Sequence, residues 1–595
     1  MTVKEPTTGG PSPTPDPEDG AAAAAPVLEG AGAAERRKPT DKVVFGVSAA
    51  LVVAFIVWGI AGTENLSSVA SAVLNGIMSG GGWFFILAAS GFVVFAVWLA
   101  ASRYGKIPLG RDDEGPEFRT SSWVAMMFSA GMGIGLMFWG AAEPLSFFTS
   151  PPPGSGAAPG SPQALDVAMS TALFHWTLHP WSIYAVVGLA IAYGTFRKGR
   201  SQLISAAFAP LLGTRRTEGG LGKAIDIFAI FATLFGSAAS LGLGALQIGG
   251  GLQATGWMDN PGSGLLVGII VVLTIAFIAS AVSGVAKGIQ WLSNINMVLA
   301  AILAFFVFVV GPTVLILNLL PGSIGHYLAD LASMAARTGA DGPETAAWLQ
   351  SWTVFYWAWW ISWTPFVGMF IARISRGRTI RQFIAGVILI PSVVSLAWFA
   401  IFGGAAISEQ QAGNDLALAS TEGQLFGLLQ SYPLGVVLSV VAMLLVAIFF
   451  VSGADAASVV MGTISQKGSL EPSRGIVIFW GAVMGAIAAV MLLVGGSDAL
   501  SGIQNITIIM ALPFVIVMVL LCVSLYKDLR HDPLIRKENK AAEAVEQAVD
   551  YGLKAHDGDF ILNVKPMSMA DGAEEAREHG GGTLLPGEPQ PPRRA

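Results

Sequence analysis

The sequence has a single cysteine and few charged residues. Cys522 is the only cysteine among 595 residues and lies in an apolar run, so no intramolecular disulfide can form. Charged residues make up 12% of the chain, against roughly 25% in soluble domains. Because 53% of the residues are hydrophobic and the mean hydropathy is +0.63, we expect a polytopic membrane protein. The net charge of −6 then says little about partners, and nothing indicates nucleic-acid binding.

The two ends of the chain also lack long apolar runs. Residues 1–42 are rich in Pro, Gly, Ala and acidic residues and contain no signal-peptide core, which predicts a disordered cytoplasmic tail. Residues 528–595 are charged and are expected to form a second cytoplasmic tail, with a helix around Arg536–Leu553 and a Gly/Pro-rich end. Residues 43–527 between the tails predict one membrane domain.

Twelve apolar runs in this domain approach or exceed the roughly 20 residues that cross a bilayer. They lie near residues 43–62, 82–101, 121–148, 167–196, 224–254, 263–284, 292–318, 346–373, 380–406, 433–463, 474–495 and 502–526. Lys and Arg gather in alternate loops, whereas the loops 149–166, 255–262, 407–432 and 496–501 carry none. The positive-inside rule therefore predicts an all-α, multi-pass protein with both termini in the cytoplasm. The segments near 200–213 and 322–338 are expected to be short surface helices.

Five tryptophans stand within residues 351–365, SWTVFYWAWWISWTP, in the middle of an apolar run. Tryptophan normally gathers at membrane interfaces, where its N–H stays wet, so a cluster inside a span needs another cause. At about 100° per residue, most of these aromatic side chains share one helix face. Two interpretations remain open: a packed seam between helices, or an aromatic cage that holds a quaternary ammonium group by cation–π attraction.

Three glycines alternate in the third run, at Gly131, Gly133 and Gly135. Each costs about 1 kcal/mol inside a helix. Their spacing favours an unwound stretch whose backbone can bind an ion or a carboxylate over a close helix contact through small residues.

The fourth run carries FHWTLHPWSIY (174–184), where Pro180 is expected to bend the helix. His175 and His179 have the spacing of a metal pair, but no cysteine or well-placed carboxylate accompanies them, so we expect no metal there. The run also adds three aromatic residues in mid-membrane: Trp176, Trp181 and Tyr184.

Hydroxyl and acidic side chains form weaker signals. A stripe of hydroxyls in the fifth run could bind a hard cation or simply bond back to its own helix. In the tenth run, Ser452-Gly453 could open the helix. Asp455 there and Glu143 in the third run are either functional intramembrane carboxylates or wetted groups near a span end. The stripe consists of Thr233, Ser237 and Ser240.

The charge of a ligand follows from the runs that carry these motifs. Runs three, four, five and eight contain no Lys or Arg except at their predicted cytoplasmic ends. Nothing inside them therefore offers a salt bridge to an anionic substrate. The aromatic faces suit a cation that cannot donate hydrogen bonds, and free backbone N–H groups could hold a carboxylate. These features together fit a zwitterion with a methylated ammonium group.

Four long motifs carry a family resemblance. They are GMGIGLMFWGAAEPL (131–145), FHWTLHPWSIY (174–184), SLGLGALQIG (240–249) and FYWAWWISWTPFVGMFIARISRGR (355–378). From about Val43 to Asp528 the chain resembles the betaine/choline/carnitine transporters, most closely the sodium-coupled glycine betaine permeases of actinobacteria. The resemblance implies two inverted five-helix repeats, spans 3–7 and 8–12, which are preceded in the chain by two extra helices. It also implies a homotrimer in the bacterial cell membrane, in which the helix near 322–338 contributes to the contacts between subunits.

The resemblance further implies specific site residues. An aromatic box would bind the ammonium group, and the glycine stretch and two further tryptophans would line the centre of the site. These residues are Trp176, Trp181, Tyr184 and Trp360 for the box, then Trp359, Trp363, Gly131, Met132, Gly133 and Gly135. In the family, glycine at Gly135 goes with betaine and aspartate with choline. No cofactor is implied beyond coupling sodium ions, for which one site would use Ser129, Met132, Phe449, Ser452 and Gly453, and the other Thr233, Ser237 and Phe366.

Three departures from the family pattern matter. A threonine–serine pair of the betaine carriers is Ser452-Gly453 here, which removes one hydroxyl ligand, whereas serine replaces threonine at Ser237 and keeps the oxygen. The C-terminal tail is not a long polybasic helix, so osmotic activation is not expected. Sequence alone leaves open a choline, ectoine, proline or carnitine carrier, proton coupling, or exchange. A channel fits broken helices less well than alternating access does, and no reactive constellation indicates an enzyme.

Overall fold

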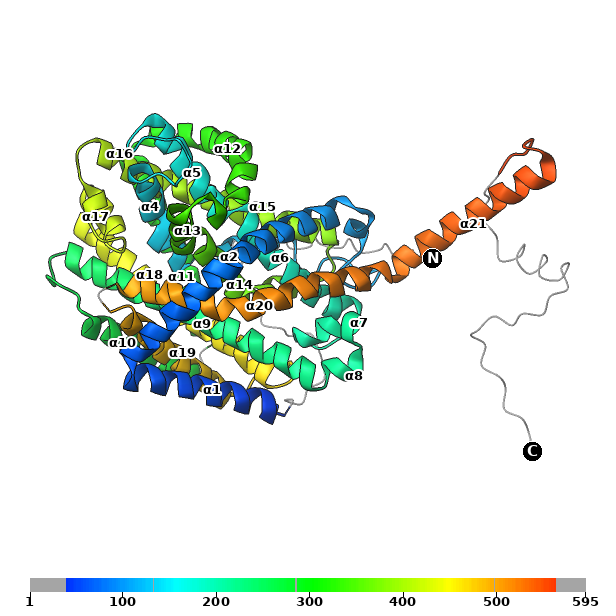
Figure 1. Ribbon diagram of the computed structural model, residues 1–595, viewed down its shortest axis with the longest axis horizontal. Coiled ribbons are helices and arrows are strands. Elements are labelled where there is room, and N and C mark those ends of the chain that lie inside the picture. The colour runs from blue at the N-terminus through cyan, green and yellow to red at the C-terminus, as the bar shows by residue number, and fades with distance from the viewer. Residues whose placement is uncertain (1–38, 132, 284–285, 497, 563–595) are drawn as a thin grey trace, which may run out of the picture. The chain divides into compact units, whose positions relative to one another are not determined.

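The computed structural model describes residues 39–131, 133–283, 286–496 and 498–562 (Figure 1). In this part of the chain the predicted all-α class is confirmed, since only one isolated bridge, between Pro108 and Thr379, lies outside helices and loops. The chain divides into two compact units, which meet between Leu529 and Arg530. The predicted N-terminal tail lies almost wholly outside the described residues.

The first half of the chain folds into helices that are connected by short loops. Short 3-10 or π-helical turns lie between or at the ends of these helices. They are η1 (Arg103–Lys106), η2 (Tyr193–Arg197) and η3 (Ser205–Phe208). The α-helices are α1 (Lys42–Ala61), α2 (Thr63–Ala101), α3 (Thr120–Gly131), α4 (Ile134–Thr149), α5 (Pro162–Trp176), α6 (Leu178–Ala192), α7 (Ala209–Leu212), α8 (Thr214–Thr217), α9 (Gly220–Ala254), α10 (Ser263–Ser283) and α11 (Ala286–Val310).

The second half repeats this all-helical pattern. Its short turns are η4 (Gly339–Asp341), η5 (Gln350–Val354), η6 (Phe399–Gly403) and η7 (Leu416–Leu418). Its α-helices are α12 (Thr313–Ala336), α13 (Pro343–Leu349), α14 (Phe355–Arg373), α15 (Ile380–Trp398), α16 (Gly404–Gln411), α17 (Gln424–Gln430), α18 (Gly435–Ser465), α19 (Arg474–Val494), α20 (Ala499–Arg530) and α21 (Pro533–His556). The helix expected around Arg536–Leu553 lies within α21.

Nine helices in the described part are long and apolar enough to cross a membrane. Four predicted spans, the third, fourth, seventh and eighth, are not among them. The third and fourth are each divided into two shorter helices, and the eighth is divided among α13, η5 and α14. The described apolar part of the seventh, Ile295–Val310, is shorter than the other spans. The third is interrupted between α3 and α4, where Gly133 is fully extended at φ −174° and ψ −177°, as the glycine spacing predicted. The exact count of twelve spans therefore stays a prediction.

The bend expected at Pro180 takes the form of a break at Thr177 (φ −121°, ψ −103°), where Pro180 has no N–H to bond the Trp176 carbonyl. Two other local expectations need correction. Ser452-Gly453 does not open α18, which runs unbroken through both residues. The helix expected near 322–338 begins earlier, at Thr313, and its length and apolarity also suit a membrane span.

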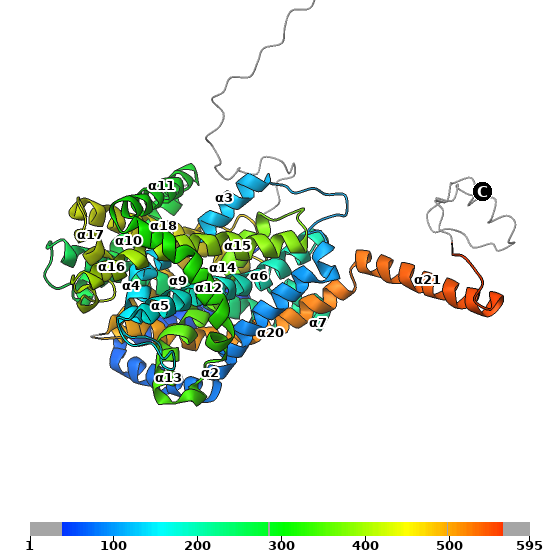
Figure 2. The ribbon, with the colours of Figure 1, turned by 90° about the horizontal axis from the view of Figure 1, so that it is seen from above.

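The aromatic helix α14 lies in the interior of the bundle, where it packs against α6 and α9 (Figure 2). Its side chains are almost all buried, and Trp357 and Trp359 are among the largest of them. Glycine permits the close approach of α9, since a Cβ on Gly236 would stand 2.6 Å from the Cβ of Ser362. The tryptophan-rich segment is therefore a packed core element that also borders the site described next.

Candidate functional site

Six aromatic residues of the predicted site line one cavity between α4, α5, α6, α14 and α15. The box rings meet mostly edge to face: Trp176 and Trp360 have centroids 4.8 Å apart at 76°, and Trp181 and Tyr184 have centroids 5.2 Å apart at 66°. Trp359 stacks on Trp360 at 4.7 Å. The six are Trp176, Trp181, Tyr184, Trp359, Trp360 and Trp363.

Four of the five indole N–H groups around this cavity donate to protein acceptors, and that of Trp181 has none in the described chain. Trp360 donates to the carbonyl of His175 at 3.0 Å, and Trp363 to the carbonyl of Gly236 at 2.9 Å. Two further indoles do the same: Trp176 donates to Glu143 Oε2 at 2.7 Å and Trp359 to Ser240 Oγ at 3.1 Å. The rings thus offer mainly their π-faces and edges, and none of the described residues that line the cavity is charged. Such a lining attracts a cation that has no hydrogen bonds to give.

The other interpretation of the aromatic stretch, a packed seam, holds for its first turn. Trp352 does not border the cavity but packs on Phe147, with ring centroids 4.6 Å apart, and on Trp139 at 5.3 Å. Trp357 stacks on His179 at 4.9 Å. The aromatic stretch therefore serves both purposes, since its start in η5 packs against α4 and its middle in α14 lines the cavity.

The start of α4 forms one wall of the cavity. Gly135 must remain small, because a Cβ there would lie 2.8 Å from Cη2 of both Trp176 and Trp359. Gly133 is the N-cap of α4 and supplies no capping side chain, so the first N–H groups of the helix remain available beside the rings. A helix N-terminus in this position suits a carboxylate.

The proposed sodium ligands gather mainly around a second cavity of about 230 Å³. It shares Gly133, Trp363 and Val367 with the aromatic cavity, so the two are neighbours. Its lining includes residues from both predicted sodium sites and from three helices: Ser237, Phe366, Phe449, Ser452 and Gly453.

The hydroxyls of these predicted ligands differ in their hydrogen bonding. Ser237 has no partner for its hydroxyl among the described residues and faces the second cavity. Ser452 donates to the carbonyl of Ile448 at 2.9 Å, and Thr233 donates to that of Ala229 at 2.8 Å while lining neither cavity. Met132 and the side chains of Ser129 and Gly131 lie outside the described residues.

Two functional candidates were missed or left open by sequence reasoning. Ser395 of α15 lines the aromatic cavity, is 2% exposed, and finds no hydroxyl partner in the described part of the chain. A lone serine in an apolar run gives no signal in sequence. Glu143, left undecided above, is fully buried and takes part in three hydrogen bonds. Asp455 is half-buried and lines neither cavity.

The two histidines of the fourth span do not converge on a metal. His175 is bonded on both ring nitrogens, to Glu143 and to Thr353, whereas His179 lies beyond the helix break and stacks on Trp357. No group of three His, Cys, Asp or Glu residues in the described chain is arranged to hold an ion.

Similarity to known proteins agrees with this geometry. The profile of the BCCT family, the betaine/carnitine/choline family transporters, matches residues 43–534. The chain belongs to this family. A betaine/ectoine transporter of Corynebacterium glutamicum, LcoP, is 46% identical over 90% of this chain and 85% of its own length. The glycine betaine transporter OpuD of Bacillus subtilis is 47% identical over 85% of this chain and 97% of its own.

This member of the betaine/carnitine/choline family is therefore a multi-pass membrane transporter and not an enzyme. A solved Na+-coupled sialic acid symporter covers 72% of the chain and 83% of its own, at 14% identity and a TM-score of 0.38. That similarity is too low to say anything about the arrangement of the helices here, so the inverted repeats stay a prediction.

Proposed function

We propose that this transporter is a sodium-coupled symporter that imports glycine betaine by alternating access. The observation that carries the proposal is the aromatic cavity, in which four indole N–H groups point away from the space between the rings. A trimethylammonium group has no N–H to donate and gains most from bare aromatic faces. The carboxylate of the zwitterion would meet the N-terminus of α4 at Gly133 and Gly135.

Sodium coupling is supported by the neighbouring cavity. This cavity adjoins the aromatic cavity at Gly133, Trp363 and Val367, and the unpartnered hydroxyl of Ser237 faces it. Sodium is a hard cation that prefers oxygen ligands. An ion held here would lie beside the substrate, so each would favour the binding of the other by a reciprocal coupling free energy.

The test is uptake of labelled glycine betaine into proteoliposomes containing the full-length protein. We expect accumulation that needs an inward sodium gradient and persists at clamped membrane potential. Uptake driven equally well by a proton gradient, or only by betaine preloaded inside, would instead indicate proton coupling or exchange. Unlabelled choline, ectoine, proline and carnitine, added in excess, identify any better substrate.

The substrate preference has a structural reason. The aromatic lining offers few free acceptors to ring or amine N–H groups, so solutes that carry them bind with donors unsatisfied, at a cost of about 1–3 kcal/mol each. Betaine is therefore expected to compete more strongly than ectoine or proline.

We further propose that both termini are cytoplasmic and that the protein assembles as a homotrimer, as the family resemblance implies.

A further inference from the structure

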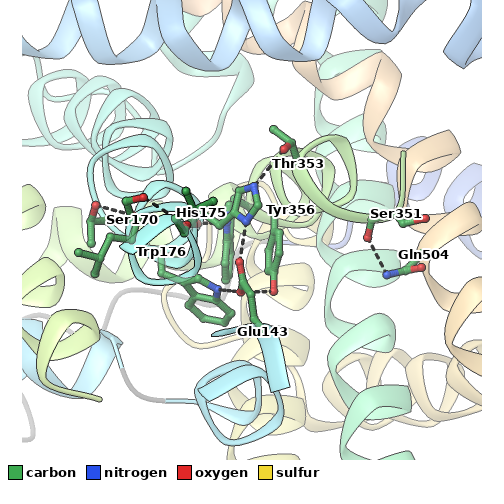
Figure 3. A network of polar contacts seen from close by, with 12 residues as sticks. Glu143, Ser170, His175, Trp176, Ser351, Thr353, Tyr356 and Gln504 are labelled. Carbon is green, nitrogen blue, oxygen red and sulfur yellow. Dashed lines mark hydrogen bonds and ion pairs between the residues drawn. The ribbon is translucent and has the colours of Figure 1, made fainter. Parts of the chain in front are cut away.

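Glu143 joins three structural elements behind the aromatic cavity (Figure 3). One carboxylate oxygen, Oε1, lies 2.6 Å from His175 Nδ1. The other, Oε2, accepts from Trp176 Nε1 at 2.7 Å and from the Tyr356 hydroxyl at 2.6 Å. Glu143, His175 and Tyr356 are all fully buried. The carboxyl group thus ties α4 to the last turn of α5 and the first turn of α14.

The bond to Trp176 does not depend on where the proton of this cluster resides. The indole of Trp176 can act only as a donor, so Oε2 always accepts its N–H, whereas the hydroxyl of Tyr356 can donate or accept. The proton between Oε1 and Nδ1 can sit on either atom, because Thr353 lies 3.0 Å from His175 Nε2 and its hydroxyl can donate or accept. Every such arrangement leaves the indole of Trp176 held by Glu143.

Glu143 holds Trp176 at a point where the backbone makes few helical hydrogen bonds. Helix α5 ends at Trp176, and Thr177 leaves helical geometry. Pro180 has no N–H to return to the Trp176 carbonyl, so the normal helical bond across the break is absent. Trp360, a second box residue, depends on the same point, because its indole donates to the carbonyl of His175. Two rings of the box are thus fixed through residues 175 and 176.

We propose that Glu143 is a positioning residue that sets the affinity of the transporter for the ammonium end of its substrate. It does so by holding the Trp176 ring against the cavity and by polarising the indole through its N–H, which makes the ring face more negative. Glu143 does not line the cavity and acts through Trp176. This inference rests on the proposed function of the aromatic cavity.

A double-mutant cycle with Glu143→Gln and Trp176→Phe tests the inference. The glutamine keeps the volume but replaces one acceptor oxygen by a donor, and the phenylalanine keeps an aromatic face but removes the N–H. Each single variant should raise the KM for betaine about tenfold at saturating sodium, with the maximal rate retained. The double variant should be no worse than the poorer single variant, because residues that act through one bond are not additive.

Two matched controls sharpen this experiment. Trp181→Phe makes the same change on an indole whose N–H has no partner in the described chain, so it should raise KM less than Trp176→Phe does. Tyr356→Phe removes the other donor to Oε2, and Glu143→Gln should still raise KM in that background. Equal losses for Trp176→Phe and Trp181→Phe would overturn the inference even if Glu143→Gln failed to fold.

A second measurement separates positioning from general damage. The compound 3,3-dimethylbutanoate has the shape and carboxylate of betaine but a neutral tert-butyl group. Wild-type protein should prefer betaine over this isostere about tenfold or more, and Glu143→Gln should shrink that preference. An unchanged preference in Glu143→Gln contradicts the inference. Lack of betaine binding by the wild type contradicts the proposed function instead.

Discussion

The indole of Trp360 illustrates how one residue shapes the cavity. Its N–H is bonded to the carbonyl of His175, its face stacks on Trp359, and its edge meets Trp176. Trp360→Leu keeps an apolar group but removes the π-face. We expect betaine binding to weaken by roughly 1–2 kcal/mol, about tenfold in affinity. Titration of the purified, folded variant with betaine measures this, and unchanged affinity would speak against an aromatic box.

Ser395 offers a second test at this scale. Its buried hydroxyl faces the aromatic cavity without a partner, so a polar group of the substrate is its natural acceptor. Ser395→Ala should raise the KM for betaine about fivefold, the value of one hydrogen bond of about 1 kcal/mol. Ser392→Ala, one turn earlier on the same helix, is the control, because that hydroxyl already donates to Ile388. The same KM in both variants would show that Ser395 does not touch the substrate.

The space around Gly135 limits which substitutions can test its role in specificity. A carboxylate at this position goes with choline in the family, yet here a Cβ alone would come within 2.8 Å of two tryptophan rings. Gly135→Ala should therefore lower betaine uptake by crowding Trp176 and Trp359. Gly133→Ala is the matched control for backbone stiffening, because its Cβ would meet nothing within 4 Å. Equal uptake by the two variants would argue that the rings yield freely.

Helix ends and breaks matter at the scale of elements. Asp41 caps α1 by accepting from Val43 and Val44 at 3.0 and 3.2 Å, and it binds Lys223 of α9 at 3.1 Å. Asp41→Ala should destabilise the folded protein by about 1 kcal/mol, whereas Asp41→Asn should keep the cap and cost less. Thermal unfolding in detergent compares them, and an alanine variant as stable as wild type would exclude a capping role.

The same carboxylate predicts a pH dependence. Burial alone raises the pKa of Asp41, but hydrogen bonds from Val44, Lys223 and Val43 outweigh it and hold the pKa below the ordinary value of 3.8. A lowered folded pKa stabilises the protein above that ordinary value and ceases to do so as the pH falls through the folded pKa. The stability gap between wild type and Asp41→Asn should therefore narrow below about pH 4.

Coupling between two sites belongs to the whole molecule. The second cavity brings together α9, α14 and α18, and it adjoins the aromatic cavity at Gly133 and Trp363. Ser237→Ala removes a free hydroxyl and should raise the sodium concentration for half-maximal uptake. Gly453→Ser should lower it, because a Cβ there meets open space and the serine restores a hydroxyl that this sequence lacks.

The control for these sodium curves is Ser458→Ala on α18. That buried hydroxyl donates to the carbonyl of Asp455 at 2.8 Å and borders neither cavity. Uptake of betaine is measured against sodium at fixed membrane potential. If Ser237→Ala and Gly453→Ser both follow the wild-type curve, the ion sits elsewhere or does not drive transport.

The sequence by itself determined the class of this protein and the types of residue at its site. Low charge indicates a membrane protein, in which the backbone groups must bond within helices or closed barrels. Apolar runs of about 20 residues have the length of membrane helices and not of strands. The glycine spacing located the interruption at Gly133, since local backbone cost decides it. The tryptophan-rich motif and its neighbours identified the family and the aromatic residues that line the cavity.

Only the tertiary structure decided how those residues act. Which ring faces border the cavity depends on where each indole N–H finds an acceptor, and the acceptors lie on other helices. Glu143 meets donors 32, 33 and 213 positions away, and no periodicity in one segment can encode such distances. Ser395 enters the cavity only because α15 packs beside α6, so an unremarkable serine becomes one of its few polar groups.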